Sequence, residues 1–359
     1  MIDQETIGLL MKGVNGVTWQ SVVMILVSFV LFYLAIVKDY EPLLLLPIGA
    51  GCLLANLPLS PLMDEHGMLR ILYQVGVENE LYPLLIFVGI GALTDFGPLL
   101  ENPKFVLLGA AGQFGIFMTL ILALLLGFTQ NEAASIGIIG AIDGPTSIYV
   151  SGILAPHMLG PITVAAYSYM SLVPIIMPPV IFALTSKEER AIRMPYSSRK
   201  ISQRTRIMFP IIVTVMVGTL VPFATPLIGM LMLGNLMKES GAVERLTKAS
   251  SNEIANMVTL FLGLAIGSTM VGTDFLKTQT LFILILGLLA FGVDCAAGVL
   301  FAKILNVISG GKVNPIIGAA GISAFPMAAR VCQRVAQQEN FDNFLLMHAM
   351  GANAAGQVA

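Results

Sequence analysis

The stretch GAIDGPTSIYV, residues 140–150, places an aspartate, Asp143, in a run that is otherwise suited to a bilayer. Gly144 and Pro145 follow at once, and these residue types are the least able to continue a helix. An Asp at the centre of a membrane helix costs about 2.5–3.5 kcal/mol. Non-helical backbone at that depth is tolerated only where protein buries it or water reaches it. The stretch therefore predicts two half-helices that meet at a functional turn inside a membrane protein.

The composition is that of a membrane protein. Of the 359 residues, 56% are hydrophobic and 11% are charged, and the mean hydropathy is +0.86; soluble domains carry roughly 25% charged residues. Apolar runs of about 20 residues recur along the chain, which predicts spanning helices and not a barrel. The first run, Val17–Val37, lacks a basic leader and a cleavage site, so we expect a retained span.

Several function classes are not supported by the sequence. The net charge of −2 indicates no nucleic-acid footprint, and we find no nucleotide-binding motif of the kind that an ATP-driven pump needs. The three cysteines and three histidines are scattered without metal-ligand spacing. We expect the cysteines, Cys52, Cys295 and Cys332, to be small buried hydrophobic residues.

A polar stretch divides the chain into two halves. This stretch, KEERAIRMPYSSRKISQRTR (187–206), holds seven of the 19 Lys and Arg residues, so the positive-inside rule predicts that it is cytoplasmic. Segments on its two sides match in the same order: IGAGCLLANL (48–57) with IGMLMLGNL (228–236), NELYPLLIFVGIG (79–91) with NEIANMVTLFLGLA (252–265), and IIGAIDGPTS (138–147) with IIGAAGISAFP (316–326). The nearly constant offsets of 180, 173 and 178 residues are typical of transporters built from repeats.

The loop charges predict that the two halves are inverted. Loop 58–80 carries one arginine against four acids, whereas its counterpart, 237–253, carries two lysines and an arginine. Equivalent loops of opposite charge belong on opposite sides of a membrane. Counting spans from the cytoplasmic stretch makes the N-terminus external and turns 133–156 and 313–331 into re-entrant hairpins.

The sequence thus predicts an all-α polytopic membrane protein. Residues 1–186 form the first transmembrane repeat, 187–206 the cytoplasmic linker, and 207–359 the second, inverted repeat. The two re-entrant hairpins meet near the bilayer midplane, with their tips at Asp143 and near Gly318–Ser323.

The hairpin tips are expected to bind a cation. No Lys or Arg occurs between Lys104 and Lys187, so Asp143 has no basic partner nearby in the sequence. A hard cation is the natural counter-charge, because carboxylate, amide and hydroxyl oxygens are hard ligands. The opposite hairpin and the last segment supply neutral oxygens of this kind: Asn314, Ser323 and Asn353. One carboxylate with neutral oxygens favours Na⁺ over Ca²⁺, which usually takes more carboxylates.

These polar residues also have structural interpretations. Asn314 precedes Pro315, a usual place for a helix cap, and Ser323 can bond a carbonyl of its own helix. Asn353 lies among small residues and can join two helices. Asp143 can cap the half-helix that follows it.

Asp294, in the stretch GVDCAAG, remains without an assignment at this stage. It suits a role beside the ion site or as a proton carrier. A buried ion pair with Lys277 or Lys303 fits its sequence position equally well.

Four blocks carry a family resemblance: GAIDGPTSIYV, AYSYMSLVPIIMPP (166–179), NPIIGAAGISAFPMAARV (314–331) and FLLMHAMGANAAGQVA (344–359). They resemble the membrane β subunit of the Na⁺-translocating biotin-dependent decarboxylases, complexes that act on oxaloacetate, methylmalonyl-CoA or glutaconyl-CoA. The stretch YLAIVKDYEPLLLLPIGAG near the start is similar as well, so the resemblance covers nearly the whole chain.

The resemblance implies a function and a set of partners. A carboxyltransferase α subunit transfers CO₂ to biotin on a carrier protein, and a small membrane γ or δ subunit completes the complex. The β subunit decarboxylates carboxybiotin, exports Na⁺ and consumes an external proton in a bacterial inner membrane. The chain lacks the Met-Lys-Met context of a biotinyl-lysine, so biotin is expected on a partner; a homo-oligomer is left open.

The resemblance also implies residue roles, by motif. It assigns Na⁺ ligands to Asp143, Asn314, Ser323 and Asn353, with Asp143 also exchanging Na⁺ for a proton. Tyr169 is implied as a proton donor or hydrogen-bond partner, although an ordinary membrane hydroxyl fits it equally well. Arg330 is implied as a catalytic residue that also binds carboxybiotin, although the positive-inside rule alone places a basic residue there.

Two other functions remain open from the residues. A secondary Na⁺/carboxylate symporter suits inverted repeats with crossed hairpins equally well. A cation/proton antiporter that uses Asp143 alone is the weaker alternative. A symporter works alone, whereas a decarboxylase subunit co-purifies with a biotinylated protein.

Overall fold

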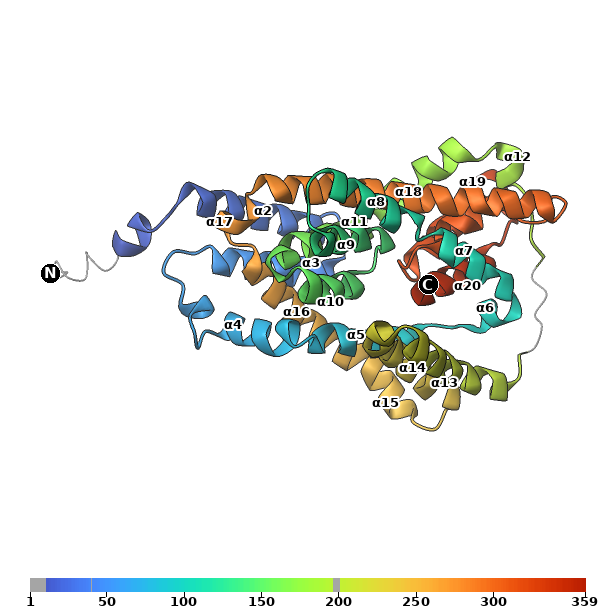
Figure 1. The fold of residues 1–359 in the computed structure, drawn as a ribbon, viewed down its shortest axis with the longest axis horizontal. Coiled ribbons are helices and arrows are strands. Elements are labelled where there is room, and N and C mark those ends of the chain that lie inside the picture. Colours follow the sequence, from blue (N-terminus) through green and yellow to red (C-terminus); the bar gives the residue numbers. More distant parts are fainter. Residues whose placement is uncertain (1–10, 40, 196–200) are drawn as a thin grey trace.

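The computed structural model describes residues 11–39, 41–195 and 201–359, and over these residues the chain folds into helices and connecting turns without a strand (Figure 1). Three helical stretches are long and apolar enough to cross a membrane: Trp19–Ile36, Pro103–Leu125 and Thr278–Ile308. Two bent helix pairs raise this number to five if each pair is one span. The predicted all-α membrane class is confirmed.

From Trp19 to Leu184, besides short 3₁₀ turns, the first half of the chain forms a series of helices. They are α2 (Trp19–Ile36), α3 (Pro42–Ala55), α4 (Met68–Leu72), the π-helix η2 (Tyr73–Glu78), α5 (Leu81–Leu93), α6 (Gly97–Glu101), α7 (Val106–Ala111), α8 (Phe114–Leu125), α9 (Gln130–Gly137), the 3₁₀ helix η4 (Ile138–Ala141), α10 (Gly144–Leu154) and α11 (Leu159–Leu184). The short turns η1 (Pro61–Met63), η3 (Pro103–Phe105) and η5 (Pro156–Met158) each begin at a proline. Proline favours such starts because its missing N–H and fixed φ cost nothing there.

The second half repeats this order of element types. After α12 (Lys187–Arg190) come α13 (Gln203–Leu220), the turn η6 (Pro222–Ala224), α14 (Thr225–Ser240), α15 (Glu244–Ala249), the π-helix η7 (Ser250–Ile254), α16 (Ala255–Thr269), α17 (Gly272–Phe275), α18 (Thr278–Ile308), the 3₁₀ helix η8 (Pro315–Gly321), α19 (Met327–Glu339) and α20 (Leu346–Val358). In both halves a helical pair precedes a short helix, a π-helix, an apolar helix, a long span, a segment broken by a 3₁₀ helix and a last helix.

The two halves pack crosswise. Helix α3 packs on α16, and α14 packs on α5. The amide of Asn56, after α3, donates to Met270 O (2.7 Å), and that of Asn235, in α14, donates to Thr94 O (3.0 Å). Met270 and Thr94 are the C-caps of α16 and α5. Each half therefore gives one partner to each of two equivalent bonds.

Small residues permit these close crossings. A Cβ added to Gly267 would lie 2.1 Å from Ile48 O, and one added to Gly234 would lie 2.0 Å from Val88 O. Both distances are far below a van der Waals contact, so only glycine fits at either crossing. Each of these helix pairs therefore joins the first half of the chain to the second.

We expect Asn56→Ala and Asn235→Ala each to destabilise the protein by about 1–3 kcal/mol, because each removes a buried hydrogen bond between the halves. The loss is larger for Asn56→Ala, since Asn56 also accepts the Gly272 N–H (3.1 Å), whereas Thr94 O keeps the Lys238 ammonium as a donor (2.9 Å). Thermal unfolding in detergent measures the effect. Asn79→Ala is the control, since the exposed Asn79 bonds only the nearby Gln74 carbonyl. Equal unfolding temperatures for all three variants would show that the Asn56–Met270 and Asn235–Thr94 bonds do not stabilise the packing of the two halves.

The predicted linker is anchored at its start. Arg190 is buried, and its guanidinium bonds Glu339 at the end of α19 (Nη2–Oε1, 2.5 Å) and stacks on Phe182 (4.8 Å to the ring centroid). Helix α13 begins at Gln203, inside the predicted linker. Residues 196–200 of the linker lie outside the described residues.

Candidate functional site

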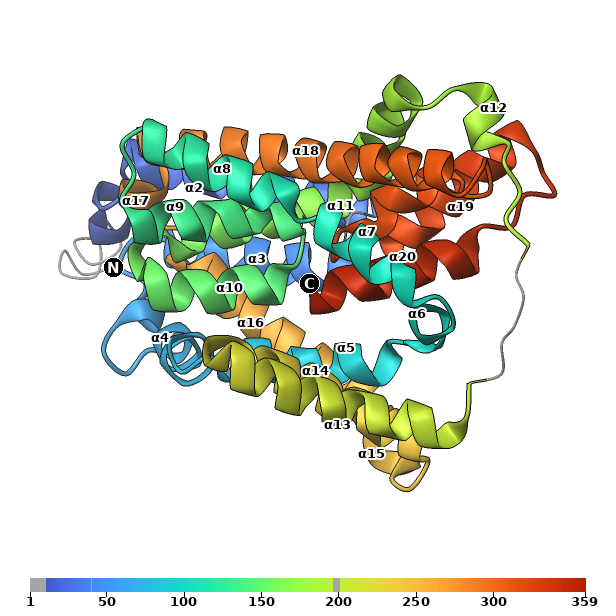
Figure 2. The same cartoon turned by 45° about the vertical axis from the view of Figure 1, so that its right-hand side comes forward.

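The first predicted hairpin is a helix, a break and a second helix. A capping box of Thr129 and Glu132 starts α9, and the chain leaves it through η4. Ile142 then adopts the left-handed region (φ 54°, ψ 42°), and the extended Asp143 is the N-cap of α10. Helices α9 and α10 pack on each other and lie side by side in Figure 2. The backbone thus breaks at the Ile142–Asp143 step.

The second predicted hairpin differs between its two limbs. Its first limb, η8, is a 3₁₀ helix, and residues 322–326 then lack helical structure up to α19. A 3₁₀ helix rises about 2.0 Å per residue against 1.5 Å for an α-helix, so a short limb reaches deeper. Gly298 and Gly318 make this limb fit against α18, because a Cβ on Gly318 would lie 2.0 Å from Gly298 O. The second limb continues to Glu339, beyond the predicted end at residue 331.

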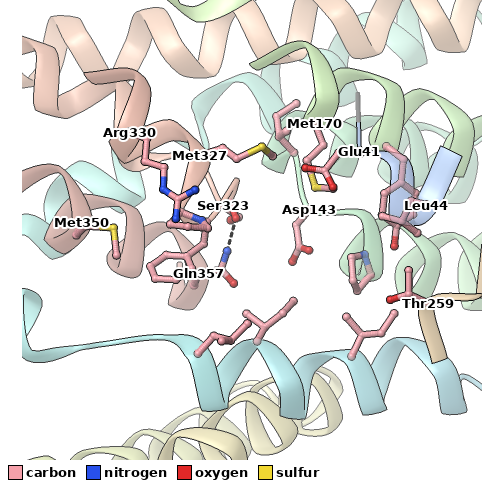
Figure 3. A pocket seen from close by; sticks show the side chains of 18 of the residues that line it. Glu41, Leu44, Asp143, Met170, Thr259, Ser323, Met327, Arg330, Met350 and Gln357 are labelled. Carbon is pink, nitrogen blue, oxygen red and sulfur yellow. Dashed lines mark hydrogen bonds between the residues drawn. The ribbon is translucent and has the colours of Figure 1, made fainter. Parts of the chain in front are cut away.

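The two tips touch. The backbone N–H of Ser323 donates to Ala141 O (3.0 Å). Helix α20 holds the same segment from the other side: Ser323 Oγ donates to Gly356 O (2.7 Å), Asn353 Nδ2 donates to Ile322 O (2.6 Å), and Gln357 Nε2 donates to Ser323 O. Figure 3 shows the bond between Gln357 and Ser323. The contact joins segments that are 182 residues apart in the chain.

A cavity of about 790 Å³ lies beside the joined tips. Asp143 and Glu41 lie on one side of it in Figure 3, and Ser323, Arg330 and Gln357 lie on the other. Glu41 and Asp143 belong to the first half of the chain, and Ser323, Arg330 and Gln357 belong to the second. Both halves of the chain therefore line the cavity.

The carboxylate of Asp143 is buried without a basic partner in the part of the chain that the structure describes. It is 7% exposed, and its carboxylate accepts a hydrogen bond from Thr146 Oγ1. None of the ion pairs among the described residues includes Asp143. The hydroxyl of Ser147 bonds the backbone oxygen of Asp143 (2.9 Å), not its carboxylate. A buried carboxylate with one hydroxyl partner has coordination capacity left for an ion.

The structure brings three of the predicted site residues to the cavity and a fourth next to it. Asp143, Ser323 and Arg330 line the cavity. Asn353 is fully buried behind the second tip, and its Oδ1 has no hydrogen-bond partner within the described part of the chain. Arg330 is solvent-exposed and takes part in none of the ion pairs found there.

Asn314 lies apart from this group. Its Oδ1 accepts from Ile316 N (3.0 Å), so it caps η8, as the structural interpretation predicts. Its Nδ2 donates to Arg190 O (2.9 Å) and Ile192 O (2.8 Å) at the start of the linker. Asn314 is absent from the cavity lining. In this conformation it anchors the hairpin to the linker.

Tyr169 also faces away from the cavity. Its hydroxyl donates to Leu284 O of α18. Tyr167, two residues earlier on the same helix, lines the cavity instead, and its ring packs on Gly144, where a Cβ would lie 2.1 Å from the ring. Two residues on an α-helix are about 200° apart, so the two rings point in opposite directions.

Sequence reasoning missed Glu41 and Gln357 as cavity residues. Glu41 stands in the polar run KDYE between two apolar segments, where it is indistinguishable from a loop acid. Gln357 follows Asn353 by four residues and so shares its helix face, which is a signal that the sequence does contain.

Asp294 has a position that the sequence left open. It is fully buried on α18, and its Oδ1 accepts the backbone N–H of Gly115. Gly115 lies in the first turn of α8, just after the break between α7 and α8, so the carboxylate satisfies a free helix N-terminus. The proposed pair with Lys303 is not formed, because Lys303 binds Glu189 (3.1 Å). Lys277 lies about 25 Å from Asp294 along the axis of α18, which is too far for an ion pair between them.

Comparison with known proteins covers nearly the whole chain. Residues 20–359 match the family described as the Na⁺-transporting oxaloacetate decarboxylase beta subunit. The chain is 53% identical to the glutaconyl-CoA decarboxylase subunit beta of Acidaminococcus fermentans over 97% of its length and 92% of the relative. It is 51% identical to the methylmalonyl-CoA decarboxylase subunit beta of Propionigenium modestum (96% and 93%). Identity to the oxaloacetate decarboxylase beta chain 2 of Salmonella typhi is 48% (94% and 92%).

Proposed function

Because the chain belongs to the β-subunit family of the Na⁺-transporting oxaloacetate decarboxylases, as its motifs indicate, we propose that it decarboxylates carboxybiotin and couples this reaction to Na⁺ export. Carboxybiotin arrives on a carrier protein that a carboxyltransferase α subunit loads, and a small membrane γ or δ subunit completes the complex. The family and the apolar helices make the chain an integral membrane protein with decarboxylase and translocase function.

The proposed membrane arrangement is an inverted repeat of 1–186 and 207–359 about the linker. The recurring element order and the exchanged Asn56–Met270 and Asn235–Thr94 bonds support it. Two equivalent interactions, each with partners from both halves, are what a two-fold relation between the halves produces. The segments 133–156 and 313–331 are then hairpins that enter from opposite sides, with the linker cytoplasmic and the N-terminus external.

The observation that carries the proposal is the meeting of both hairpin tips beside a carboxylate that forms no ion pair among the described residues. Asp143, the Ser323 hydroxyl and nearby backbone carbonyls supply the hard oxygens that Na⁺ prefers. Asn353, which bonds Ile322 at the second hairpin tip, offers its side-chain oxygen Oδ1 as a further ligand for the same ion. The predicted roles of Asn314 as a Na⁺ ligand and of Tyr169 as a proton donor stay predictions. In the present conformation Asn314 anchors the second hairpin to the linker, and Tyr169 anchors α11 to α18.

Coupling follows from charge. With the cavity open to the cytoplasm, Na⁺ binds Asp143 while Arg330 holds the carboxybiotin anion. The N–C bond to the carboxyl group breaks, CO₂ leaves, and the ureido nitrogen takes up a proton. That proton enters from outside through Asp143, and neutralising the carboxylate releases Na⁺ outward. Moving one charge against 100 mV costs about 2.3 kcal/mol, so the decarboxylation and the ion step must be gated together.

The proposal is tested with the assembled complex in proteoliposomes. We expect saturable activation of carboxybiotin decarboxylation by Na⁺, together with ²²Na⁺ movement across the membrane that stops when decarboxylation stops. Heat-inactivated carboxyltransferase is the control, because it removes carboxybiotin and leaves the membrane subunit intact. Na⁺-driven carboxylate uptake by the chain alone, without decarboxylation, would favour the symporter.

A further inference from the structure

A second carboxylate faces the cavity that holds Asp143. Glu41 lines this cavity from the N-terminus of α3, and Figure 3 shows Glu41 and Asp143 on the same side of it. No ion pair among the described residues includes Glu41. The ammonium of the nearby Lys38 stacks instead on the Tyr33 ring, 5.9 Å from its centroid.

The fold does not need an acid at this position. Glu41 is the N-cap of α3, yet its side chain makes no capping bond, and its backbone is left-handed (φ 37°, ψ 59°). A non-glycine residue pays for that conformation, and such residues cluster at functional sites. At the offset of 180 residues Glu41-Pro42 corresponds to Val221-Pro222, and the N-cap of α14 is Ala224, so the second half starts the matching helix without a carboxylate.

The cavity also presents an unmet acceptor. Gln357 is 9% exposed and lines the cavity, and its Nε2 donates to Ser323 O, which turns Oε1 away from that carbonyl. No described residue donates a hydrogen bond to Oε1. An amide oxygen that accepts no hydrogen bond, in a cavity with two carboxylates, is free to coordinate a cation.

The charge balance of the cavity requires more than one cation during turnover. Its titratable lining residues are Glu41, Asp143, Tyr167 and Arg330. With the phenol neutral, two carboxylates face one guanidinium, and a single monovalent cation balances them. An anionic carboxylated ligand at Arg330 consumes the guanidinium charge and leaves both carboxylates to be neutralised.

We propose that Glu41 is a second binding group for a monovalent cation in this cavity, filled by Na⁺ or a proton when a carboxylate anion occupies Arg330. The proposal rests on the proposed function. It places the second cation on the α3 side of the cavity, apart from the hairpin tips. Asp143 and Glu41 then bind their cations with negative cooperativity, because a cation on one carboxylate weakens the negative potential that attracts a cation to the other.

The test compares Glu41→Gln with Glu80→Gln in the complete complex. Glu80 is a matched control: it is also a left-handed N-cap (φ 59°) without a capping bond, at the start of α5, and it does not line the cavity. We measure ²²Na⁺ binding with the anionic substrate present, and turnover against Na⁺ concentration and pH. Glu41→Asp serves as the conservative variant, since it keeps the charge on a shorter side chain.

We expect Glu41→Gln to lose this negative cooperativity, because only one cation site remains, while Glu80→Gln matches the parent protein. If the second cation is Na⁺, Glu41→Gln binds about one Na⁺ fewer and its Na⁺ midpoint rises roughly tenfold, as expected for loss of one charged ligand. If it is a proton, Na⁺ binding is kept and the pH profile of turnover shifts. Glu41→Asp restores part of either effect.

Unchanged Na⁺ binding, cooperativity and pH profile in Glu41→Gln overturn the inference while leaving the proposed function standing. The absence of Na⁺-activated decarboxylation in the parent complex overturns the proposed function itself. A variant that fails to assemble is recognised by loss of the carrier protein on purification, and Glu41→Asp then decides the question.

Discussion

Asp143→Asn is expected to lower Na⁺-dependent decarboxylation by at least about 100-fold, or about 2.7 kcal/mol at 1.36 kcal/mol per tenfold change. Asparagine keeps the size and an acceptor oxygen for Thr146 Oγ1, so the cap and the hairpin tip stay intact. In the proposed mechanism it removes the charge that binds Na⁺ and the group that carries the proton. Na⁺ affinity and turnover therefore fall together, as measured by ²²Na⁺ binding and by CO₂ release from carboxybiotin.

Asp95→Asn is the matched control for this variant. Asp95 is also an acid at the end of an apolar helix, but it bonds Gly97 N (2.8 Å) and lies 3.5 Å from Arg206, away from the cavity. We expect its turnover to stay within about twofold of the parent. An Asp143→Asn complex with the parent's Na⁺ midpoint and turnover would place the ion elsewhere.

Arg330→Ala is expected to reduce decarboxylation by about 100-fold with Na⁺ binding retained. Arg330 lines the cavity from the first turns of α19, next to Met327, Met347 and Met350. A guanidinium holds a carboxylate through two parallel hydrogen bonds, and flexible methionines suit an apolar ring such as that of biotin. The loss should appear mainly in KM for carboxybiotin, because the positive charge binds the anion before reaction.

Arg330→Lys separates charge from geometry. Lysine keeps the charge without the planar fork, so we expect an intermediate loss of about tenfold. Arg334→Ala is the control: it removes an exposed arginine one turn along α19 that does not line the cavity. A similar loss in both alanine variants would assign the effect to surface charge and not to a carboxylate site.

Much of this protein follows from its sequence because a bilayer allows few solutions. Long apolar runs have to become helices, since every backbone group needs a partner away from water. The sequence Asp143-Gly144-Pro145 interrupts a helix, and in the structure the helical backbone is broken between η4 and α10. The matched segments before and after the linker correspond to elements of the same type and order.

Other features depended on side-chain directions that sequence spacing does not specify. Tyr167 and Tyr169 have the same chemistry and lie two residues apart, and only the packing of α11 on α10 and α18 decides which of them faces the cavity. Asn314 was expected with Ser323, yet the two amide hydrogens of its side chain bond the linker. The sequence cannot reveal this, because the linker carbonyls are more than 120 residues away.

By itself, then, the sequence determined the membrane class, the broken helix at Asp143 and the family, while the inverted repeat stays a prediction. Only the tertiary structure decided that the two tips meet through Ser323 and Ala141, that Asp294 caps α8, and that Glu41 shares a cavity with Asp143. The physical reason is range. Helix formation and its interruption depend on neighbouring residues, whereas partners for buried charges are found across the fold, where distant segments are brought together by packing.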